Sequence, residues 1–255
     1  DAGLVSVAAG GSTMISNGGR IGSETSSSGN AGAVQVNAGS LSIDGKNPLT
    51  GKNALTGVSS DANPGATGSA GKVEVTVSGA LSLTNAGQIS SSTWSPGNAR
   101  SSGDAGIVLI DADSIKIDGS SGSGIFSQAN GTKDNGYVTG NAGGVDLKTV
   151  GKIEIGNGGQ ISSSTSSSGD AGFVSVDAGG SITISNGGWI RSETFSSGNA
   201  GTVQVNAGSL SIDGRNSLTG ENMLTGISSE ANPGATGSAG RVEVTVSGDL
   251  SLTNA

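Results

Sequence analysis

DAGFVSVDAGGSITISNGGWIRSET, residues 170–194, is the stretch from which the fold of the whole chain is inferred. Its aliphatic residues occupy alternate positions in three short runs, which is the period of a β-strand with one buried face. Gly179-Gly180 and Asn186-Gly187-Gly188 separate the runs, and both breaks contain residues that tolerate a positive φ at a corner. Neither break resembles the two-residue turns of hairpins. The chain is therefore predicted to keep turning in one direction, with three short strands per coil.

The same unit recurs along the whole sequence. A strand start of the form Ala-Gly-x-Val occurs eight times, at spacings between 29 and 39 residues. At a second level, residues 1–86 reappear as residues 170–255 with 70 of 86 positions identical. Residues 1–255 are interpreted as one repetitive segment, in which a five-coil superunit, 1–169, is partially repeated in 170–255. We expect about eight coils, all-β, and expect the segment to be an excerpt of a longer chain. The starts are Ala2, Ala31, Ala70, Ala105, Ala142, Ala171, Ala200 and Ala239.

Comparison of the two copies predicts which side chains point inward. The alternate aliphatic residues, Leu55 among them, are unchanged in the second copy, as expected for a shared core. Changes in size and charge are expected on the solvent side. These changes are Leu4 to Phe173, Arg20 to Trp189, Ser26 to Phe195 and Lys52 to Glu221.

Asparagine recurs at positions interpreted as corners. Two explanations stay open: the amides form a ladder between coils, or asparagine merely tolerates the left-handed conformation there. The extra length of the longer coils is predicted to form loops protruding from one region, at residues 45–69, 94–103 and 119–140. The asparagines are Asn17, Asn157, Asn186, Asn37 and Asn206.

Composition excludes several classes of protein. The chain has 48 Gly, six aromatic residues, and no Cys or His. A formal charge of −8 and scattered basic residues oppose nucleic acid as a partner, because phosphate binding needs clustered Lys and Arg. No apolar run is long enough to span a bilayer. The acidic balance is expected to keep a long surface soluble.

The amino-acid sequence of the coils resembles the repeat region of filamentous haemagglutinin-type exoproteins, which are large adhesins secreted by the two-partner route. The resemblance rests on Ala-Gly-x-Val-x-Val, Leu-x-Ile-x-Asn-Gly-Gly and Ile-Ser-Ser-Ser-Thr segments. The Gly-Asn-Ala-Gly sequence of residues 29–32 and 198–201 is especially similar to that of cyanobacterial members. The resemblance implies a right-handed parallel β-helix at the cell surface or outside the cell, used for adhesion or filament formation.

The residues that carry catalysis in many enzymes are absent. Without His and Cys, Ser-His and Cys-His nucleophiles and the usual zinc sets are excluded. Polysaccharide chemistry on a β-helix needs paired acids, and the best cluster is Asp111, Asp113 and Asp118. Strand alternation places Asp111 and Asp113 on the outward face. We interpret that face as solvated, and predict no metal, no cofactor and no catalysis.

The exposed aromatic residues are the candidate binding residues. Trp94 and Phe195 occupy the same position, five residues after the aliphatic residue of the third strand, and Trp189 is predicted to point outward. Exposed rings could stack on sugars or on a neighbouring fibre, although isolated surface aromatics are also ordinary.

The sequence therefore predicts a structural and adhesive rod module of an extracellular filament or surface adhesin. Its expected partners are further repeats or copies of itself, and cell-surface glycans or receptors. Two alternatives stay open, a polysaccharide-acting β-helix enzyme and a carbohydrate-binding adhesin.

Overall fold

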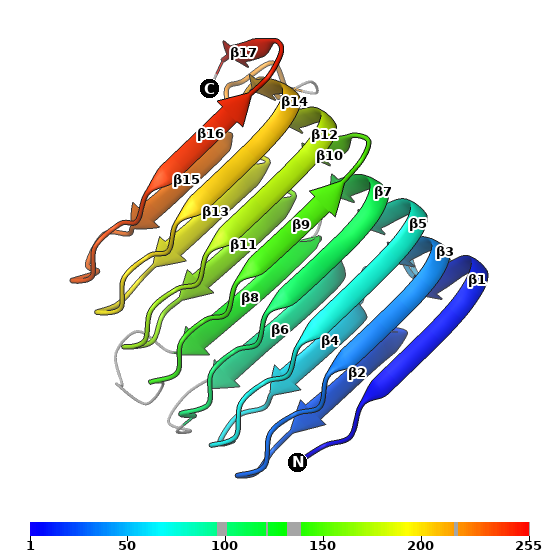
Figure 1. The fold of residues 1–255 in the computed structure, drawn as a ribbon, viewed down its shortest axis with the longest axis vertical. Helices are drawn as coiled ribbons and strands as arrows, with labels where there is room; N and C mark the ends of the chain where they lie inside the picture. Colours follow the sequence, from blue (N-terminus) through cyan, green and yellow to red (C-terminus); the bar gives the residue numbers. More distant parts are fainter. Residues whose placement is uncertain (96–100, 121, 132–138, 217–218, 255) are drawn as a thin grey trace.

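The computed structural model describes residues 1–95, 101–120, 122–131, 139–216 and 219–254. Within these residues the regular secondary structure is entirely β, and no helix occurs among them. The strands form two sheets, and every pairing between named strands is parallel. In Figure 1 the strands lie side by side from the N-terminal end of the molecule to the C-terminal end.

The longer sheet contains the first two aliphatic runs of each repeat. Its hydrogen-bonded order is β1-β3-β5-β7-β10-β12-β14-β16, with β9 and β17 beside this path. Its strands are β1 (Val5–Ser16), β3 (Val34–Asp44), β5 (Val73–Thr84), β7 (Val108–Asp118), β9 (Val145–Thr149), β10 (Ile153–Gly156), β12 (Val174–Ser185), β14 (Val203–Asp213), β16 (Val242–Val246) and β17 (Leu250–Thr253).

The shorter sheet contains the third run of each repeat. Its order is β15-β13-β11-β8-β6-β4-β2, which is simply the order of these strands along the chain, reversed. Its strands are β2 (Arg20–Thr25), β4 (Thr56–Ala62), β6 (Gly87–Ser95), β8 (Gly124–Gly131), β11 (Gln160–Thr165), β13 (Trp189–Thr194) and β15 (Gly226–Ala231).

The chain alternates between the two sheets, so each repeat stacks on the one before it. Equivalent residues of successive repeats are paired directly, and the valine of the Ala-Gly-x-Val start forms an unbroken column. This stack confirms the predicted all-β architecture with parallel strands and is consistent with a β-solenoid. The column contains Val5, Val34, Val73, Val108, Val145, Val174, Val203 and Val242.

The first two runs of a repeat join in one bent strand in β1, β3, β5, β7, β12 and β14. The register shifts between Ala178 and Ser181, where the Gly179-Gly180 break falls. The prediction of a positive φ at these two glycines is wrong, because the left-handed positions include neither. Glycine is needed there for another reason: a Cβ on Gly180 would collide with the carbonyl oxygen of Gly151 in the adjacent repeat. The break is thus a bulge with close backbone approach.

The asparagine positions divide into two kinds. Asn17, Asn157 and Asn186 have φ values of 50°, 52° and 47°, so the left-handed explanation holds at these corners. The amide explanation holds in addition at one pair, since Asn186 Nδ2 donates to Asn157 Oδ1. Asn37 and Asn206 are not at corners: they lie within β3 and β14, paired to residues of neighbouring strands.

The aliphatic core lies between the sheets and runs through the whole stack. Most predicted inward residues are in it, but Leu55 is 51% exposed. The prediction failed because β4 begins at Thr56, which places Leu55 outside the strand. The hydroxyl of Thr56 accepts a bond from the Gly18 amide at 2.7 Å, and Val58 is the residue that enters the core.

A buried serine column runs beside the aliphatic core. In each third strand the middle inward residue is serine, and its hydroxyl links two repeats. Ser91 Oγ, for example, donates to Gly71 O and accepts from Gly106 N, both at 2.8 Å. Both glycines belong to Ala-Gly-x-Val starts. A Cβ on the glycine of such a start would collide with the carbonyl oxygen of the equivalent glycine in the previous repeat. The serines of the column are Ser23, Ser60, Ser91, Ser127, Ser163, Ser192 and Ser229.

A second ladder follows the corner that precedes each Ala-Gly-x-Val start. The second residue of each Gly-x-Ala-Gly segment accepts a hydrogen bond from the backbone amide of its equivalent in the next repeat. Asn141 N donates to Asp104 Oδ1 at 2.6 Å, and Asp170 N donates to Asn141 Oδ1 at 2.8 Å. The ladder is Asp1, Asn30, Ser69, Asp104, Asn141, Asp170, Asn199 and Ser238.

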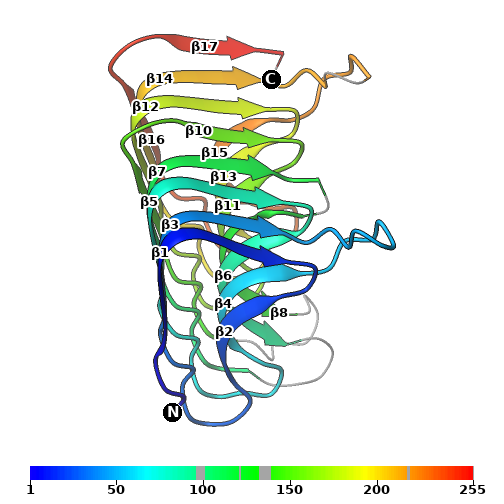
Figure 2. The same ribbon diagram turned by 90° about the vertical axis from the view of Figure 1, so that its right-hand side faces the viewer.

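Two loops protrude on the same side of the stack, after β3 and after β14 (Figure 2). The first contains an antiparallel bridge between Lys46 and Asn53, and the second repeats it between Arg215 and Asn222. This fits the predicted loop within 45–69, although β4 also lies in that range. The predicted loops at 94–103 and 119–140 are wrong in part, because β6 extends to Ser95 and β8 occupies Gly124–Gly131. Residues 96–100, 121 and 132–138 of these ranges are outside the described residues.

Candidate functional site: the outer face of the shorter sheet

Trp94 lies at the C-terminal end of β6, and its side chain points away from the core. It is 56% exposed, as the sequence predicted for an outward position. The ring borders a trough of about 350 Å³ on the outer face of β4, β6 and β8. We call this hollow the Trp94 trough. Its lining is Arg20, Glu24, Leu55, Asp61, Ala62, Asn63, Gln88, Ser90, Ser92, Trp94, Gln128 and Asn130.

The trough exists because small residues on β6 lie between larger ones. Ser92 pairs with Asp61 on one side and with Gln128 on the other. Outward residues of a strand alternate with inward ones, so Ser90, Ser92 and Trp94 follow one another along the outer face. The two serines form the floor, and the longer side chains of the neighbouring strands form the walls. The indole closes one end.

One wall is an ion-pair cluster. The Arg20 guanidinium lies 3.6 Å from Glu24 Oε1 and 3.3 Å from Asp61 Oδ2, and it also donates to Ser59 Oγ. Burial raises the pKa of Asp61, and the bond from Ser59 and the charge of Arg20 offset only part of that effect. Asn63 Nδ2 donates to Glu24 Oε2 at 3.0 Å. These contacts hold the carboxylate oxygens in fixed directions.

The opposite wall carries side-chain amides. Asn130 Nδ2 donates to Gln128 Oε1 at 2.8 Å, which orients both groups on β8. Gln88, at the other end of β6, donates from Nε2 to Gly122 O. A side-chain amide has two donor hydrogens and an acceptor oxygen. The two walls therefore differ: one consists mainly of acceptors, and the other offers donors and acceptors together.

Trp189 does not lie in this trough. It is the first residue of β13, where it pairs with Gln160 and Gly226. Its ring is half-buried, and the Arg191 guanidinium lies 5.6 Å from the ring centroid. The structure thus places Trp189 beside Arg191 of its own strand and away from the trough.

Arg191 joins this aromatic contact to a buried acid. Its guanidinium is 2.9 Å from Glu193 Oε1, and it donates to Gln160 Oε1 at 3.1 Å. Burial raises the pKa of Glu193, while the charge of Arg191 and a bond from Asn232 act in the opposite direction. Trp189, Arg191 and Glu193 form an ordered patch along β13.

Phe195 follows directly after β13 and is half-buried. The strand register makes it the equivalent of Trp94, as predicted, but β8 and β11 lie between the two strands. At roughly 4.8 Å per strand, the two rings are about 14 Å apart along the stack. The three candidate aromatics therefore belong to two separate places, with Trp94 alone at the trough.

The acidic cluster is divided as well. Asp111 and Asp113 are both exposed on the outer face of β7, as predicted. Asp118 ends the strand, where its carboxylate accepts from Ser120 at 2.6 Å and from Asn157 Nδ2 at 3.2 Å. Burial acts to raise the pKa of Asp118, but these hydrogen bonds bring it below its ordinary value.

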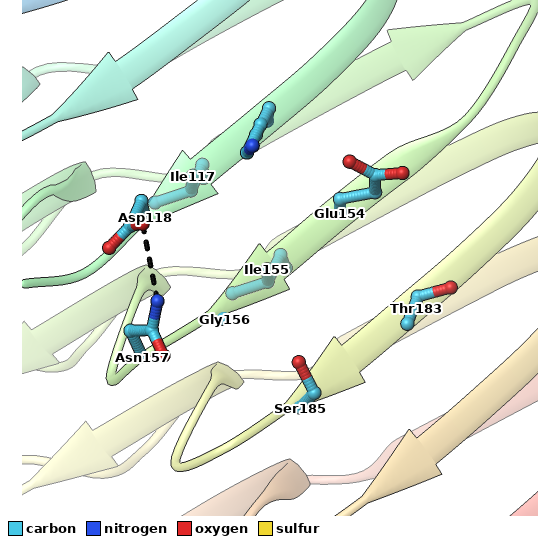
Figure 3. Close-up of a pocket in the computed structure, with 9 residues that line it drawn as sticks. Ile117, Asp118, Glu154, Ile155, Gly156, Asn157, Thr183 and Ser185 are labelled. Atoms are coloured by element: carbon cyan, nitrogen blue, oxygen red, sulfur yellow. Dashed lines mark hydrogen bonds between the residues drawn. The ribbon is translucent and has the colours of Figure 1, made fainter. Parts of the chain in front are cut away.

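Asp118 lines a shallow hollow of about 260 Å³ beside Glu154 and Asn157 (Figure 3). Lys116, Thr183 and Ser185 are among its other lining residues, and none of the lining residues is aromatic. Across the described ranges no three acidic side chains come together as ligands for a metal ion. The charged side chains of this polar hollow are Lys116, Asp118 and Glu154.

Sequence reasoning found Trp94 but missed the rest of the trough. Asp61, Asn63 and Gln128 come from strands that are 30 to 40 residues apart in sequence from their neighbours. The signal that could have identified them is positional. Asp61 and Gln128 come three residues after the aliphatic residue of their third strand, as Ser92 does, and Asn63 comes five residues after it, as Trp94 does. Aligning the third runs of all repeats would have placed them beside Ser92 and Trp94.

No protein-family model, no curated protein and no solved structure matches this chain. Among the residues described, no helix is both long and apolar enough to cross a membrane.

Proposed function

We propose that this chain is a non-catalytic structural and adhesive rod module of an extracellular filament or surface adhesin. In this proposal the stack is a right-handed β-helix of three short strands per coil and about eight coils. Right-handedness is supported by the strong preference of parallel β-strand crossovers for that hand. Further repeats, or copies of the same chain, continue the rod, and cell-surface glycans or receptors are its partners.

The observation that carries the proposal is the unbroken axial pairing of equivalent residues. The valine column, the serine column and the corner ladder all repeat from turn to turn. Such a stack is stabilised by nearest-neighbour contacts and can be lengthened without a new fold. Duplication of 86 residues also repeats most of a surface, which suits a spacer better than a single catalytic groove.

Negative-stain imaging of the native protein tests the proposal. We expect thin filaments of uniform width, because each added turn extends the same cross-section. Gly172→Ala, which places a methyl group between two turns, is expected to disrupt the filaments. Compact particles of the wild-type protein, with no filament at any concentration, would contradict the proposal.

A polysaccharide-acting enzyme is the second candidate, and the exposed pair Asp111 and Asp113 is the observation that favours it. The test is release of reducing ends from neutral and acidic polysaccharides. The proposed function predicts none. Turnover by the wild type that is lost in Asp111→Ala or Asp113→Ala, with unchanged circular dichroism, would establish the enzyme instead.

A further inference from the structure

The Trp94 trough combines an exposed ring with polar groups that are already oriented. Aromatic residues are rare in this chain, yet this indole is 56% exposed at the end of a hollow. An indole presents a broad apolar face with a negative quadrupole, which attracts the slightly positive C–H groups of a pyranose ring. The hollow in front of it is about 350 Å³, within the size range of small-ligand sites.

The two walls match the hydroxyl groups of a sugar. Each hydroxyl is both a donor and an acceptor. The carboxylates of Glu24 and Asp61 are fixed by Arg20 and can accept from such groups. Across the floor, the amides of Gln128 and Asn130 can donate and accept. A ligand lying along β6 on the small floor residues would contact both walls at once.

The charge of the trough selects against anionic ligands. Two carboxylates and one guanidinium line it, and the whole chain carries a formal charge of −8. The guanidinium is shared between the two acids, so it is not available as a separate anion site. Sulfated or uronic-acid chains would bring further negative charge into a site that is already negative. A neutral ligand meets no such cost.

The shape of the trough favours a chain over a single sugar. Gln88 and Trp94 mark its extent along β6, and six residues of strand span about 20 Å. The trough is open to solvent along this length, because its floor consists of Ser90 and Ser92. An oligosaccharide of several units can therefore lie along these floor residues.

We propose that the Trp94 trough is a binding site for a neutral oligosaccharide chain of pyranose units, stacked on Trp94 and hydrogen-bonded to the β4 and β8 walls. The site deepens the adhesive part of the proposed function, on which it rests, by naming the class of partner. The proposed site uses Trp94 without Trp189, because the two rings lie at separate places on the sheet.

Isothermal titration calorimetry on the 255-residue chain tests the site. The probes are cellohexaose, laminarihexaose and maltohexaose, with a heparin hexasaccharide as the anionic comparison. We expect at least one neutral hexasaccharide to bind with a Kd below millimolar, and the heparin probe not to bind. Trp94→Ala is expected to weaken the binding about tenfold or more, because one stacked ring contributes about 1.4 kcal/mol.

Two variants make the result specific to the trough. Ser92→Trp fills the floor without touching the core and should also abolish binding, whereas the matched control Trp189→Ala should leave it unchanged. Circular dichroism and melting temperatures show whether each variant has folded. If either Trp94→Ala or Ser92→Trp has not folded, the other variant decides the result. The proposal is overturned if no neutral probe binds at millimolar concentration, if only heparin binds, or if binding survives both trough variants. Filament images remain unaffected by these outcomes, so failure of the site and failure of the rod are separate results.

Discussion

At the scale of single residues, the inward serines have a role that an aliphatic residue could not fill. Each third strand ends near the Gly-x-Ala-Gly corner, where the backbone must pass close to the turn below. Ser91 satisfies a glycine amide and a glycine carbonyl from different repeats, both in the interior. Buried backbone groups without partners are costly, so the hydroxyl column makes this narrow side of the core possible.

Removing one hydroxyl from this column should lower stability. Ser91→Ala leaves a buried amide and a buried carbonyl without their partner, and we expect a loss of about 1–3 kcal/mol in the free energy of unfolding. Ser90→Ala, one residue away on the outer face, is the matched control and should change stability by less than about 0.5 kcal/mol. Urea denaturation followed by circular dichroism measures both. Equal effects of the two substitutions would show that the column is not stabilising.

The glycines beside this column are required for close approach. Gly172→Ala puts a methyl group against the carbonyl oxygen of Gly143, and neither backbone can move without breaking the ladder. We expect a loss of about 3 kcal/mol or more. Gly156→Ala is the control, because its neighbours in the same column are Asp118 and Ser185 and only the Ser185 hydroxyl comes near. Thermal melts of the two variants should differ clearly, and a wild-type melting temperature for Gly172→Ala would contradict this reading of the turn.

At the scale of structural elements, the corner ladder keeps negatively charged side chains of successive turns apart. Carboxylates at Asp104 and Asp170 are separated by the neutral amide of Asn141, and no two aspartates are adjacent in the ladder. All these residues keep an oxygen that can accept the amide of the next turn. The ladder therefore preserves its acceptors while avoiding stacked negative charges.

Asn141→Asp tests this arrangement. It keeps the acceptor but stacks three carboxylates, so we expect a loss of about 1–2 kcal/mol at neutral pH. The loss should shrink at high ionic strength, because salt screens the repulsion between exposed charges. Asn141→Ser is the control, because the Ser69 hydroxyl already accepts the backbone amide of Asp104 in the next turn. Urea denaturation at low and at high salt gives both comparisons, and a difference that does not depend on salt would count against repulsion as the cause.

The patch on β13 gives a second prediction for this scale. Arg191→Ala leaves the buried Glu193 carboxylate without its ion-pair partner, at a cost of about 2–3 kcal/mol at neutral pH. Burial already raises the pKa of Glu193, and loss of Arg191 raises it further, so the folded chain binds this proton more tightly than the unfolded chain. The variant should therefore gain stability relative to wild type as the pH falls from neutral through that raised pKa. Melting temperatures across this range, with Arg191→Lys as the charge-retaining control, measure the effect; a constant difference would exclude Glu193 as its source.

At the scale of the whole molecule, the two parallel sheets present long outer faces. Because the chain carries a formal charge of −8, the faces of neighbouring molecules repel one another. Loops after β3 and β14 protrude on the same side of the stack (Figure 2). We expect the negative charge of the chain to oppose bundling.

Lateral association should accordingly depend on pH and salt. Near the sequence pI of about 4.4 the net charge vanishes, and we expect light scattering to rise steeply as the pH approaches that value. At pH 7, added salt should increase scattering modestly by screening the repulsion. The starting state should return on raising the pH again. A scattering signal that stays constant from pH 7 to pH 4.4 would mean that charge does not hold the molecules apart.

Much of this fold is determined by the sequence alone, because its signals are local and repeated. Alternating valines and isoleucines define the inward face, the Asn-Gly pairs define the left-handed corners, and the repetition aligns the turns. Leu55 was misplaced because a loop ends beside it, and only the register of β4 shows that Val58 enters the core.

Contacts between turns were decided by the tertiary structure. The distance between Ser92 and Asp61 or Gln128 along the chain gives no sign that they form one trough, and the separation of Trp94 from Trp189 depends on where each falls on the sheet. Gly180 and Gly172 look like flexible corner residues in the sequence, yet they are needed for the close passage of neighbouring backbones. The physical reason is the same in each case: periodicity along a strand fixes the direction in which a side chain points, whereas the stacking of parallel strands fixes what it meets.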